Sequence, residues 1–474
     1  MPEAKKRAAE IVRTLRQQGH QAYLAGGCVR DLLLSREPAD YDVATDATPQ
    51  QVMQIFPQTY AVGEQFGVVL VPESESGGAT GVPARQGTTV EVATFRSDAG
   101  YSDGRHPDEV RFTKSPQEDV QRRDFTINGM MLDPATNEVL DFVGGQDDLK
   151  AGIVRAIGDP NRRFTEDKLR MLRAVRFAAR FNYKIDPATM AAIQKLAPKI
   201  HQVSCERVHE ELTKMLTEGQ ARRAFELLDT TKLLPEVLPE IAAMKGVQQP
   251  PQYHPEGDVF VHTLLLLEKL QPKASGSVSG SVSGSVSGPV SKTLAWGALL
   301  HDVGKPATFR IAPDRIRFDG HVEVGVKMAA EICRRLRFSN HETDQILALV
   351  DNHMRFGAVQ RMKQSTLKKF LRLPAFEEHL ELHRIDCLSS HGQLEAYEYT
   401  REQLRSLPPE AIRPTPLITG RDLIEAGYEP SPRFKEVLTA VEDAQLEGRL
   451  TSREAAMEFV RREFPVQLRG WTEK

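Results

Sequence analysis

Residues 24–42 read LAGGCVRDLLLSREPADYD, and this stretch decides how the N-terminal part of the chain folds. It predicts a short strand, a glycine turn, one helix and a second short strand. Because glycine has no side chain, Gly26 and Gly27 allow a phosphate to come close to the backbone. Arg30 follows one helical turn later and can pair with phosphate oxygens. The stretch therefore predicts a phosphate-binding turn.

Two carboxylates follow at the end of the same stretch. Asp40 and Asp42 flank Tyr41, and residues two apart on a strand point to the same face. Two hard oxygen ligands on one face suit a pair of magnesium ions that bridges nucleotide phosphates. The competing interpretation is that the aspartates cap a strand end, because a glycine pair followed by Asp-x-Asp also occurs by chance.

Composition limits the class of protein. The chain has 474 residues, which is enough for about three domains at ~150 residues each. Its net charge of −3 excludes a uniformly basic nucleic-acid-binding protein, so any basic patch is local. The four cysteines are scattered without a Cys-x-x-Cys pair, which argues against a zinc knuckle or a disulfide framework. We expect a cytoplasmic protein, because free cysteines suit a reducing compartment, the N-terminus is too charged for a signal peptide and no apolar run approaches ~18 residues.

Further elements are expected in the first 157 residues. An amphipathic helix is predicted at 4–19, a helix that begins at 48–49 and ends near 56, and strands at 67–71, 88–95 and 153–157. Residues 72–87 predict an exposed insertion, and residues 96–115 predict a mobile loop over the site. On the strand TTVEVATF, Glu91 is either an ordinary edge charge or a third metal ligand. We favour the ligand because Asp40 and Asp42 would otherwise lack a third carboxylate.

A pair of arginines precedes the apolar turn in EDVQRRDFTINGMM, residues 118–131. Arg123 is a candidate contact for a triphosphate, and the alternative is a solvated helix end. Residues 160–245 are predicted to be helical throughout, with RRFTEDKLRMLRAVRFAARF as one helix. On such a helix Asp167 and Arg170 are neighbours, and Arg173 and Arg176 continue the row. Because the helix is apolar around much of its circumference, some arginines must lie in a groove or at an interface.

Histidines become frequent in residues 254–395. The segment ALLHDVGK places His301 and Asp302 at the end of an apolar helix, with His262 before it and Asp386 after it. His321 and His353 could add further ligands. Imidazole with carboxylate suits a transition metal or magnesium that acts on a phosphoester. The Gly-Ser-Val-Ser repeat at 274–291 predicts a flexible loop. Residues 396–474 carry no catalytic pattern.

The segments AGGCVRDLLL…ADYDVAT, VEVATFR, RRDFTING and TEDKLRMLRAVRFAARF resemble, in this order, the motifs of class II tRNA nucleotidyltransferases and bacterial poly(A) polymerases. Residues 254–395 resemble an HD phosphohydrolase domain. The resemblance implies an α+β protein, with a small mixed-sheet head followed by an all-α neck, body, HD domain and tail. The expected boundaries are 1–157 for the catalytic head, 158–248 for the neck and body, 249–395 for the HD domain and 396–474 for the tail.

The resemblance also implies residue roles. Asp40 and Asp42 hold magnesium and Glu91 is the third carboxylate. In the HD domain a divalent ion (magnesium, manganese, nickel or cobalt) is held by His262, His301, Asp302 and Asp386. The positions that match nucleotide contacts are Gly26, Gly27, Arg30, Arg123, Asp167, Arg170, Arg173 and Arg176. Gly129 departs from the motif, where alanine is usual.

The implied activity is addition of CCA to the 3′ end of tRNA from CTP and ATP, with phosphohydrolase activity in the HD domain. Poly(A) polymerase, A-only and CC-only enzymes share these motifs. A different class of function would be an HD phosphohydrolase whose head senses nucleotides, or an inactive RNA-binding protein, and the complete carboxylate set argues against both. Neither DNA nor a membrane is expected as a partner.

Overall fold

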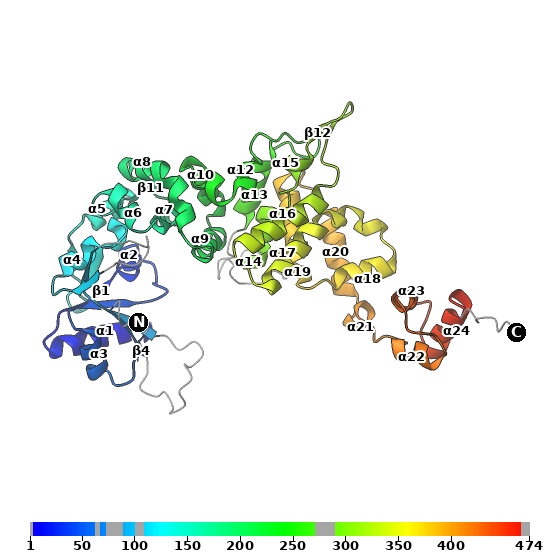
Figure 1. Ribbon diagram of the computed structural model, residues 1–474, viewed down its shortest axis with the longest axis horizontal. Coiled ribbons are helices and arrows are strands. Elements are labelled where there is room, and N and C mark those ends of the chain that lie inside the picture. The colour runs from blue at the N-terminus through cyan, green and yellow to red at the C-terminus, as the bar shows by residue number, and fades with distance from the viewer. Residues whose placement is uncertain (1–2, 62–66, 73–88, 100–108, 271–289, 466–474) are drawn as a thin grey trace, which may run out of the picture. The chain divides into compact units, whose positions relative to one another are not determined.

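The computed structural model describes residues 3–61, 67–72, 89–99, 109–270 and 290–465 (Figure 1). The chain divides into two compact units, one ending at Ala243 and one beginning at Met244. The first unit holds a mixed sheet and a set of helices, and the second is almost entirely helical. The expected α+β class is therefore confirmed, whereas the finer division into four domains stays a prediction.

A seven-stranded sheet forms the core of the first unit, in the order β3-β4-β5-β2-β1-β8-β9. Its strands are β1 (Ala22–Ala25), β2 (Asp42–Thr45), β3 (Tyr60–Ala61), β4 (Val68–Pro72), β5 (Thr89–Thr94), β8 (Met130–Leu132) and β9 (Val139–Asp141). Only β2 and β5 pair in parallel, and the other neighbours are antiparallel. This parallel pair aligns Asp42 with Glu91, which places two of the three expected carboxylates side by side at one end of the sheet.

Local sequence accounts for these elements. In α1 (Glu3–Gln17) the residues Ala8, Ile11, Val12 and Leu15 recur at helical spacing, and all four are buried. The helix α2 (Gly27–Leu33) follows the glycine turn, and α3 (Pro49–Ile55) begins with a capping box on Thr48. The expected alternation of β5 is confirmed, because its residues 90, 92 and 94 are buried. The remaining helices of the head are α4 (Pro116–Gln121), the 3-10 turn Thr126–Asn128 and α5 (Gly145–Ala151).

Two expectations for the head were wrong. Residues 96–115 are not a loop throughout, because β6 (Arg96–Ala99) and β7 (Glu109–Phe112) form an antiparallel pair; residues 100–108 lie outside the described chain. The strand expected at 153–157 is limited to β10 (Ile153–Val154), which pairs with β11 (Lys184–Ile185) in the following helical segment and not with the main sheet. The insertion expected at 72–87 lies, except for Pro72, outside the described residues.

The segment RRFTEDKLRMLRAVRFAARF was predicted to form one long helix, and this prediction was wrong. The segment forms α6 (Pro160–Glu166) and α7 (Leu169–Phe181), with extended backbone at Asp167, where φ is −143° and ψ is 108°. The Asp167 carboxylate accepts a hydrogen bond from the backbone N–H of Leu169 at 3.0 Å, and this local bond competes with helix continuation. The remaining elements are α8 (Pro187–Leu196), the 3-10 helix Ala197–Gln202, α9 (Cys205–Thr217), α10 (Ala221–Thr230), α11 (Leu234–Val237) and α12 (Pro239–Ala242).

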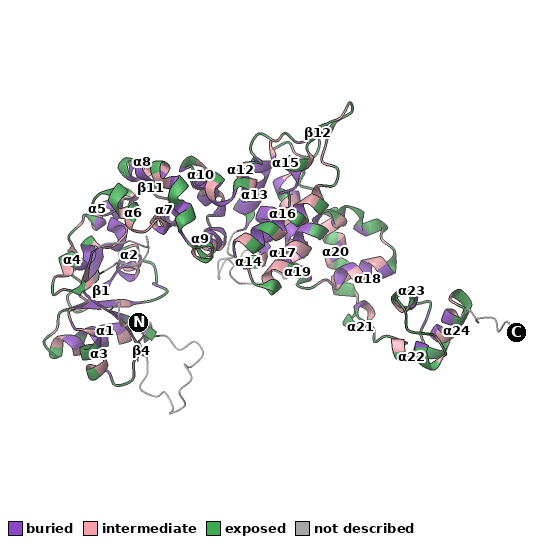
Figure 2. Cartoon of the chain, in the orientation of Figure 1, coloured by how far each residue is buried: buried purple, intermediate pink, exposed green. Residues whose placement is uncertain are grey.

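The second unit gathers five helices around the HD motif. They are α13 (Val259–Lys269), α14 (Lys292–Leu300), α16 (His321–Arg335), α17 (Asn340–Asn352) and α19 (Phe376–Ser389). Each of them carries buried residues, which are purple in Figure 2. Trp296 of α14 is fully buried. Gly304, two residues after Asp302, lies against α16, where an added Cβ would be 2.6 Å from the backbone nitrogen of Gly325. A larger residue would therefore push α16 away from the HD motif. The repeat at 274–291 lies, up to residue 289, outside the described chain.

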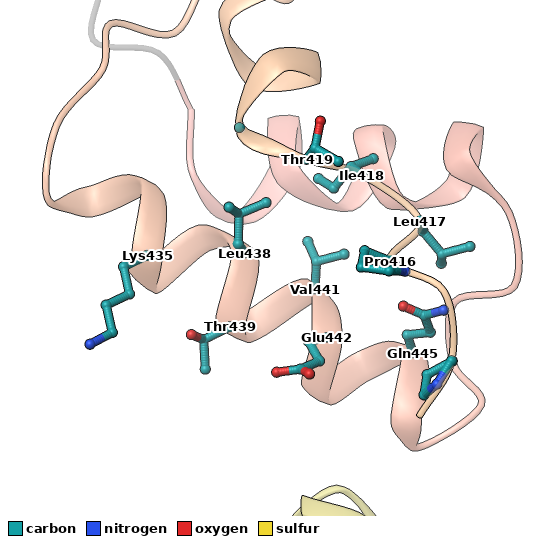
Figure 3. Close-up of a pocket in the computed structure, with 12 residues that line it drawn as sticks. Pro416, Leu417, Ile418, Thr419, Lys435, Leu438, Thr439, Val441, Glu442 and Gln445 are labelled. Carbon is teal, nitrogen blue, oxygen red and sulfur yellow. The ribbon is translucent and has the colours of Figure 1, made fainter. Parts of the chain in front are cut away.

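Smaller elements complete the second unit. They are α15 (Lys305–Thr308), β12 (Arg310–Ile311), β13 (Ile316–Arg317), the 3-10 helix His353–Arg361, α18 (Gln364–Leu371), α20 (Glu395–Ser406), α21 (Pro409–Ile412), α22 (Gly420–Glu425), α23 (Arg433–Leu446) and α24 (Arg453–Glu463). A cavity of about 580 Å³ lies between residues 414–420 and α23 (Figure 3). In the described chain no helix is long and apolar enough to cross a membrane.

Candidate active site and candidate metal centre

The three head carboxylates affect one another electrostatically. Asp42 is the first residue of β2 and lies opposite Glu91 of β5, whereas Asp40 lies in the bend before β2 and not on the strand. Burial, together with the charges of Asp40 and Glu91, raises the pKa of Asp42 to about 7, and Arg123 opposes this rise. Partial desolvation and the charge of Asp40 also raise the pKa of Glu91. A divalent cation would relieve this repulsion, and hard oxygen donors are the ligands that magnesium prefers.

The head site is nevertheless open. Among the described residues, groups of three or more ligand atoms within 4.8 Å of one another occur only in the second unit. Asp40 and Glu91 are exposed and Asp42 is partly exposed, so their side chains are accessible from solvent. The head therefore offers the right donors for magnesium without a closed cage of ligands.

Gly26 and Arg123 bring a cation next to these carboxylates. Gly26 has a φ of +75°, and a Cβ there would lie 2.9 Å from Nη1 of Arg123 and 3.9 Å from Oδ2 of Asp42. Asp119, which is buried, holds Arg123 through Nε at 3.2 Å and Nη2 at 3.0 Å. The glycine turn thus leaves room for the guanidinium beside Asp42, as a triphosphate contact requires.

Arg30 lies in the interior and not in the open turn. It is only 4% exposed, it pairs with Asp31 at 2.8 Å, and its Nη1 donates to Asn128 at 2.6 Å. Its guanidinium also lies against the rings of Phe177 and Phe181 in α7. Arg30 therefore fastens α2 to α7, and a direct phosphate contact stays a prediction.

The structure separates the residues that were expected to form one row on a helix. Asp167 pairs with Arg207 at 2.9 Å, while Arg170 pairs with Glu166 at 3.0 Å. The expected neighbour contact between the Asp167 and Arg170 side chains is therefore absent, because the two residues lie on either side of the break between α6 and α7. A backbone hydrogen bond of 3.2 Å links them instead.

The other two arginines of the row also have acidic partners. Arg173 pairs with Asp124 at 2.8 Å, which holds the pKa of the partly exposed Asp124 at about 2 despite the opposing effect of desolvation. Arg176 is buried and pairs with Glu211 at 2.7 Å. Sequence reasoning missed Glu211, because it comes from a distant helix and nothing in its local pattern marks it.

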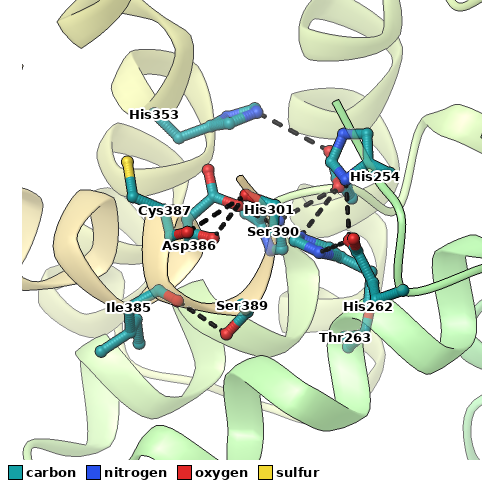
Figure 4. A network of polar contacts seen from close by, with 12 residues as sticks. His254, His262, Thr263, His301, His353, Ile385, Asp386, Cys387, Ser389 and Ser390 are labelled. Atoms are coloured by element: carbon teal, nitrogen blue, oxygen red, sulfur yellow. Dashed lines mark hydrogen bonds and ion pairs between the residues drawn. The ribbon is translucent and has the colours of Figure 1, made fainter. Parts of the chain in front are cut away.

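The candidate metal centre lies among the helices of the second unit (Figure 4). His262 Nε2 lies 3.1 Å from Asp386, and His301 Nε2 lies 3.1 Å from Asp302. On the other side of Asp302, the Nε2 atoms of His321 and His353 lie at 3.9 and 3.8 Å. All four residues expected as ligands, and the two that could add to them, thus come together.

The imidazoles are oriented as metal ligands. The Nδ1 atoms of His301, His321 and His353 lie 2.7–2.9 Å from backbone carbonyl oxygens. Because a carbonyl only accepts, each Nδ1 carries the proton and each Nε2 presents a lone pair to the centre. These Nε2 atoms are buried without a hydrogen-bond partner, and burial, the largest influence, holds the pKa of His353 at about 4. The set therefore fits a divalent cation.

Two supporting residues of the centre were not predicted. Glu256 lies 2.9 Å from Nδ1 of His254 and 2.7 Å from Nδ1 of His262, and so orients the His262 ring. Lys305 pairs with Asp302 at 2.7 Å. Glu256 follows the histidine in HPEGD by two residues, and Lys305 belongs to the quoted HDVGK, so both were visible in the sequence without a role.

Three family models match the chain. Residues 22–155 match the poly A polymerase head domain, residues 182–245 match the probable RNA and SrmB-binding site of polymerase A, and residues 261–404 match the HD domain. The head, the RNA-binding segment and the HD domain are thus each similar to the corresponding parts of CCA-adding enzymes and bacterial poly(A) polymerases. The expectation drawn from the motifs is thereby confirmed.

Relatives in this family are similar over part of their length. The CCA-adding enzyme of Geobacillus sp. (strain WCH70) is 42% identical over 49% of this chain and 54% of its own length. The CCA-adding enzyme of Enterococcus faecalis is 43% identical over 46% of this chain and 50% of its own length. The chain thus spans about half the length of the curated relatives it matches. The structure of the Bacillus stearothermophilus CCA-adding enzyme in complex with CTP is 26% identical, covers 98% of this chain and 99% of the other, and has a TM-score of 0.70.

Proposed function

We propose that this protein adds CCA to the 3′ end of tRNA, using CTP and ATP. The observation that carries the proposal is the Asp42–Glu91 pair on the parallel strands β2 and β5, with the charge of Asp40 acting on Asp42 and the Arg123 guanidinium beside Asp42 over the Gly26 turn. The names of the relatives, CCA-adding enzymes in two bacteria, support the same reaction.

The chemistry assigned to the head follows from its residues. Asp40 and Asp42 would hold magnesium, with Glu91 beside them, and bound ions would activate the RNA hydroxyl and stabilise the leaving pyrophosphate. Arg123 would bind the triphosphate, because its guanidinium is fixed by Asp119 and still has Nη1 directed over the turn.

Base selection is assigned to Asp167 and Arg170. Cytosine and adenine share an exocyclic amino donor beside an unprotonated ring nitrogen, whereas uracil and guanine do not present this pair at the matching edge. Asp167 pairs with Arg207, but a carboxylate has about four acceptor positions, so it can still accept from the amino group. Arg170 would donate to the ring nitrogen, which requires its guanidinium to leave Glu166.

The direct test is incubation of tRNA that lacks its last three nucleotides with CTP alone, ATP alone and both. We expect two C residues with CTP, and two C residues followed by one A with both nucleotides. A long A tail would instead identify a poly(A) polymerase. Addition of only A or only CC would identify a partial enzyme, and no addition at all would contradict the proposal.

A second activity is proposed for the histidine-rich centre, namely metal-dependent hydrolysis of phosphoesters at RNA 3′ ends or in small nucleotides. The supporting observation is the set of buried, unpartnered imidazole nitrogens around Asp302. Metal content per chain, measured after dialysis against magnesium, manganese, nickel and cobalt in turn, identifies the ion. Absence of any bound ion would contradict the assignment.

A further inference from the structure

Three guanidinium groups surround one aromatic ring at the end of α7. The central carbons of Arg30, Arg36 and Arg180 lie 4.6, 5.3 and 5.5 Å from the centre of the Phe181 ring. Phe181 is only 6% exposed, so the ring is held in place by its packing. Contacts of this kind are favourable for each cation separately, but they bring three like charges together.

The acidic groups around this ring do not balance the three charges. Arg30 pairs with Asp31 at 2.8 Å. Arg180 lies 3.4 Å from Glu218, which Arg176 also approaches at 3.7 Å. Arg36 has no ion-pair partner in the part of the chain that the structure describes, and its side chain is exposed. An anion from outside the chain would complete the cluster.

Arg36 is also close to the carboxylates of the head. It precedes Asp40 by four residues, and a chain spans at most about 3.3–3.6 Å per residue, so the two Cα atoms are separated by no more than roughly 14 Å. Stacked nucleotides rise about 3.4 Å each along a strand. If the RNA 3′ hydroxyl lies at Asp40 and Asp42, the phosphates of about the last four nucleotides lie within a similar distance of these carboxylates, so a strand that runs toward Arg36 brings one of these phosphates to its guanidinium.

We propose that Arg36, supported by Arg180, binds a backbone phosphate of the RNA close to its 3′ end. The inference rests on the proposed function and names a contact for its RNA substrate. An arginine presents a planar fork that suits two phosphate oxygens, and the Phe181 ring holds this fork in position before RNA arrives. Arg30 is buried and contributes its charge without a direct contact.

The test uses Arg36→Gln and Arg36→Lys in the full chain, with Arg13→Gln as the matched control. Arg13 is an exposed arginine of α1 in the same unit. The dissociation constant of tRNA without CCA is measured over a range of KCl concentrations. Loss of one phosphate contact lowers the slope of log affinity against log salt by about 0.7–0.9. We expect this decrease for Arg36→Gln, the wild-type slope for Arg36→Lys and Arg13→Gln, and an unchanged KM for CTP in all three.

The salt dependence distinguishes a phosphate contact from a purely structural role of Arg36. If Arg36→Gln keeps the wild-type slope, the inference is wrong, whether or not its melting temperature falls, because a structural role would change stability and leave the slope unchanged. If the wild-type chain adds CCA while the slope is unaltered in Arg36→Gln, only the inference fails. If the wild-type chain adds no nucleotide to tRNA, the proposed function fails, and a lower slope in Arg36→Gln would then report an RNA contact without that reaction.

Discussion

The buried pair of Arg176 and Glu211 gives a sharp test of whether Arg176 contacts the nucleotide or supports the fold. Nε of Arg176 lies 2.7 Å from Oε2 of Glu211, and the two side chains are 7% and 4% exposed. Arg176→Met would leave Glu211 charged and buried, with Glu218 as a further carboxylate nearby. Removing one partner of such a pair costs about 3–5 kcal/mol. For a unit of this size the expected decrease in melting temperature is about 6–20 °C.

The double variant Arg176→Met/Glu211→Leu should recover most of this stability, because replacing both members of a buried pair by apolar groups is often neutral. Far-UV circular dichroism follows the melting, and tryptophan fluorescence is an internal control, since both tryptophans, Trp296 and Trp471, lie beyond the first unit. We expect the double variant to keep a KM for CTP within about threefold of the wild type. A folded double variant whose KM rises tenfold, or a single variant that loses less than about 1 kcal/mol, would refute a structural role.

Four further outcomes are expected. The double variant Asp40→Ala/Asp42→Ala should incorporate no nucleotide and still bind tRNA in a gel-shift assay; residual addition above a few per cent would contradict the role of these carboxylates. His301→Ala should lower bound metal and phosphoester hydrolysis while CCA addition stays near normal. Gly26→Ala should raise the KM for CTP, since φ is +75° and the new Cβ would lie 2.9 Å from the Arg123 guanidinium. An unchanged KM would contradict the assignment of this turn to triphosphate binding. Asp167→Ala should accept UTP more readily, whereas unchanged rejection of UTP in steady-state kinetics would exclude base reading by this residue.

Some of the head could be predicted because local chemistry decides it. The Gly26 turn, the Thr48 cap and the alternation of β5 are each set by residues within one short segment. The convergence of the histidines on Asp302 was also predictable, because the order His262, His301-Asp302 and Asp386 along the chain already indicated one metal site. The role of Glu91 was inferred from the need for a third carboxylate, and the parallel register with Asp42 now supports it.

Other features depend on contacts that the sequence does not display. Periodicity favoured one helix through Asp167, but the pairing of this carboxylate with Arg207, forty positions away, and its bond to the Leu169 N–H stabilise a break. Arg176 belongs to the same apparent row as Arg173, yet it is buried and pairs with Glu211. Periodicity assigns residues to a face of a helix, and it does not indicate whether that face meets solvent, substrate or a buried carboxylate.

The short parallel pair of β10 and β11 has a consequence for how this chain can be divided. Residues 153 and 154 pair with residues 184 and 185, and Arg155 bridges Asp148 and Asp186. A fragment that stops at residue 157 would therefore expose an unpaired strand edge and lose an acidic partner of Arg155. Recombinant chimeras that exchange heads between relatives should consequently join after residue 243, since a junction at 157 cuts through one compact unit.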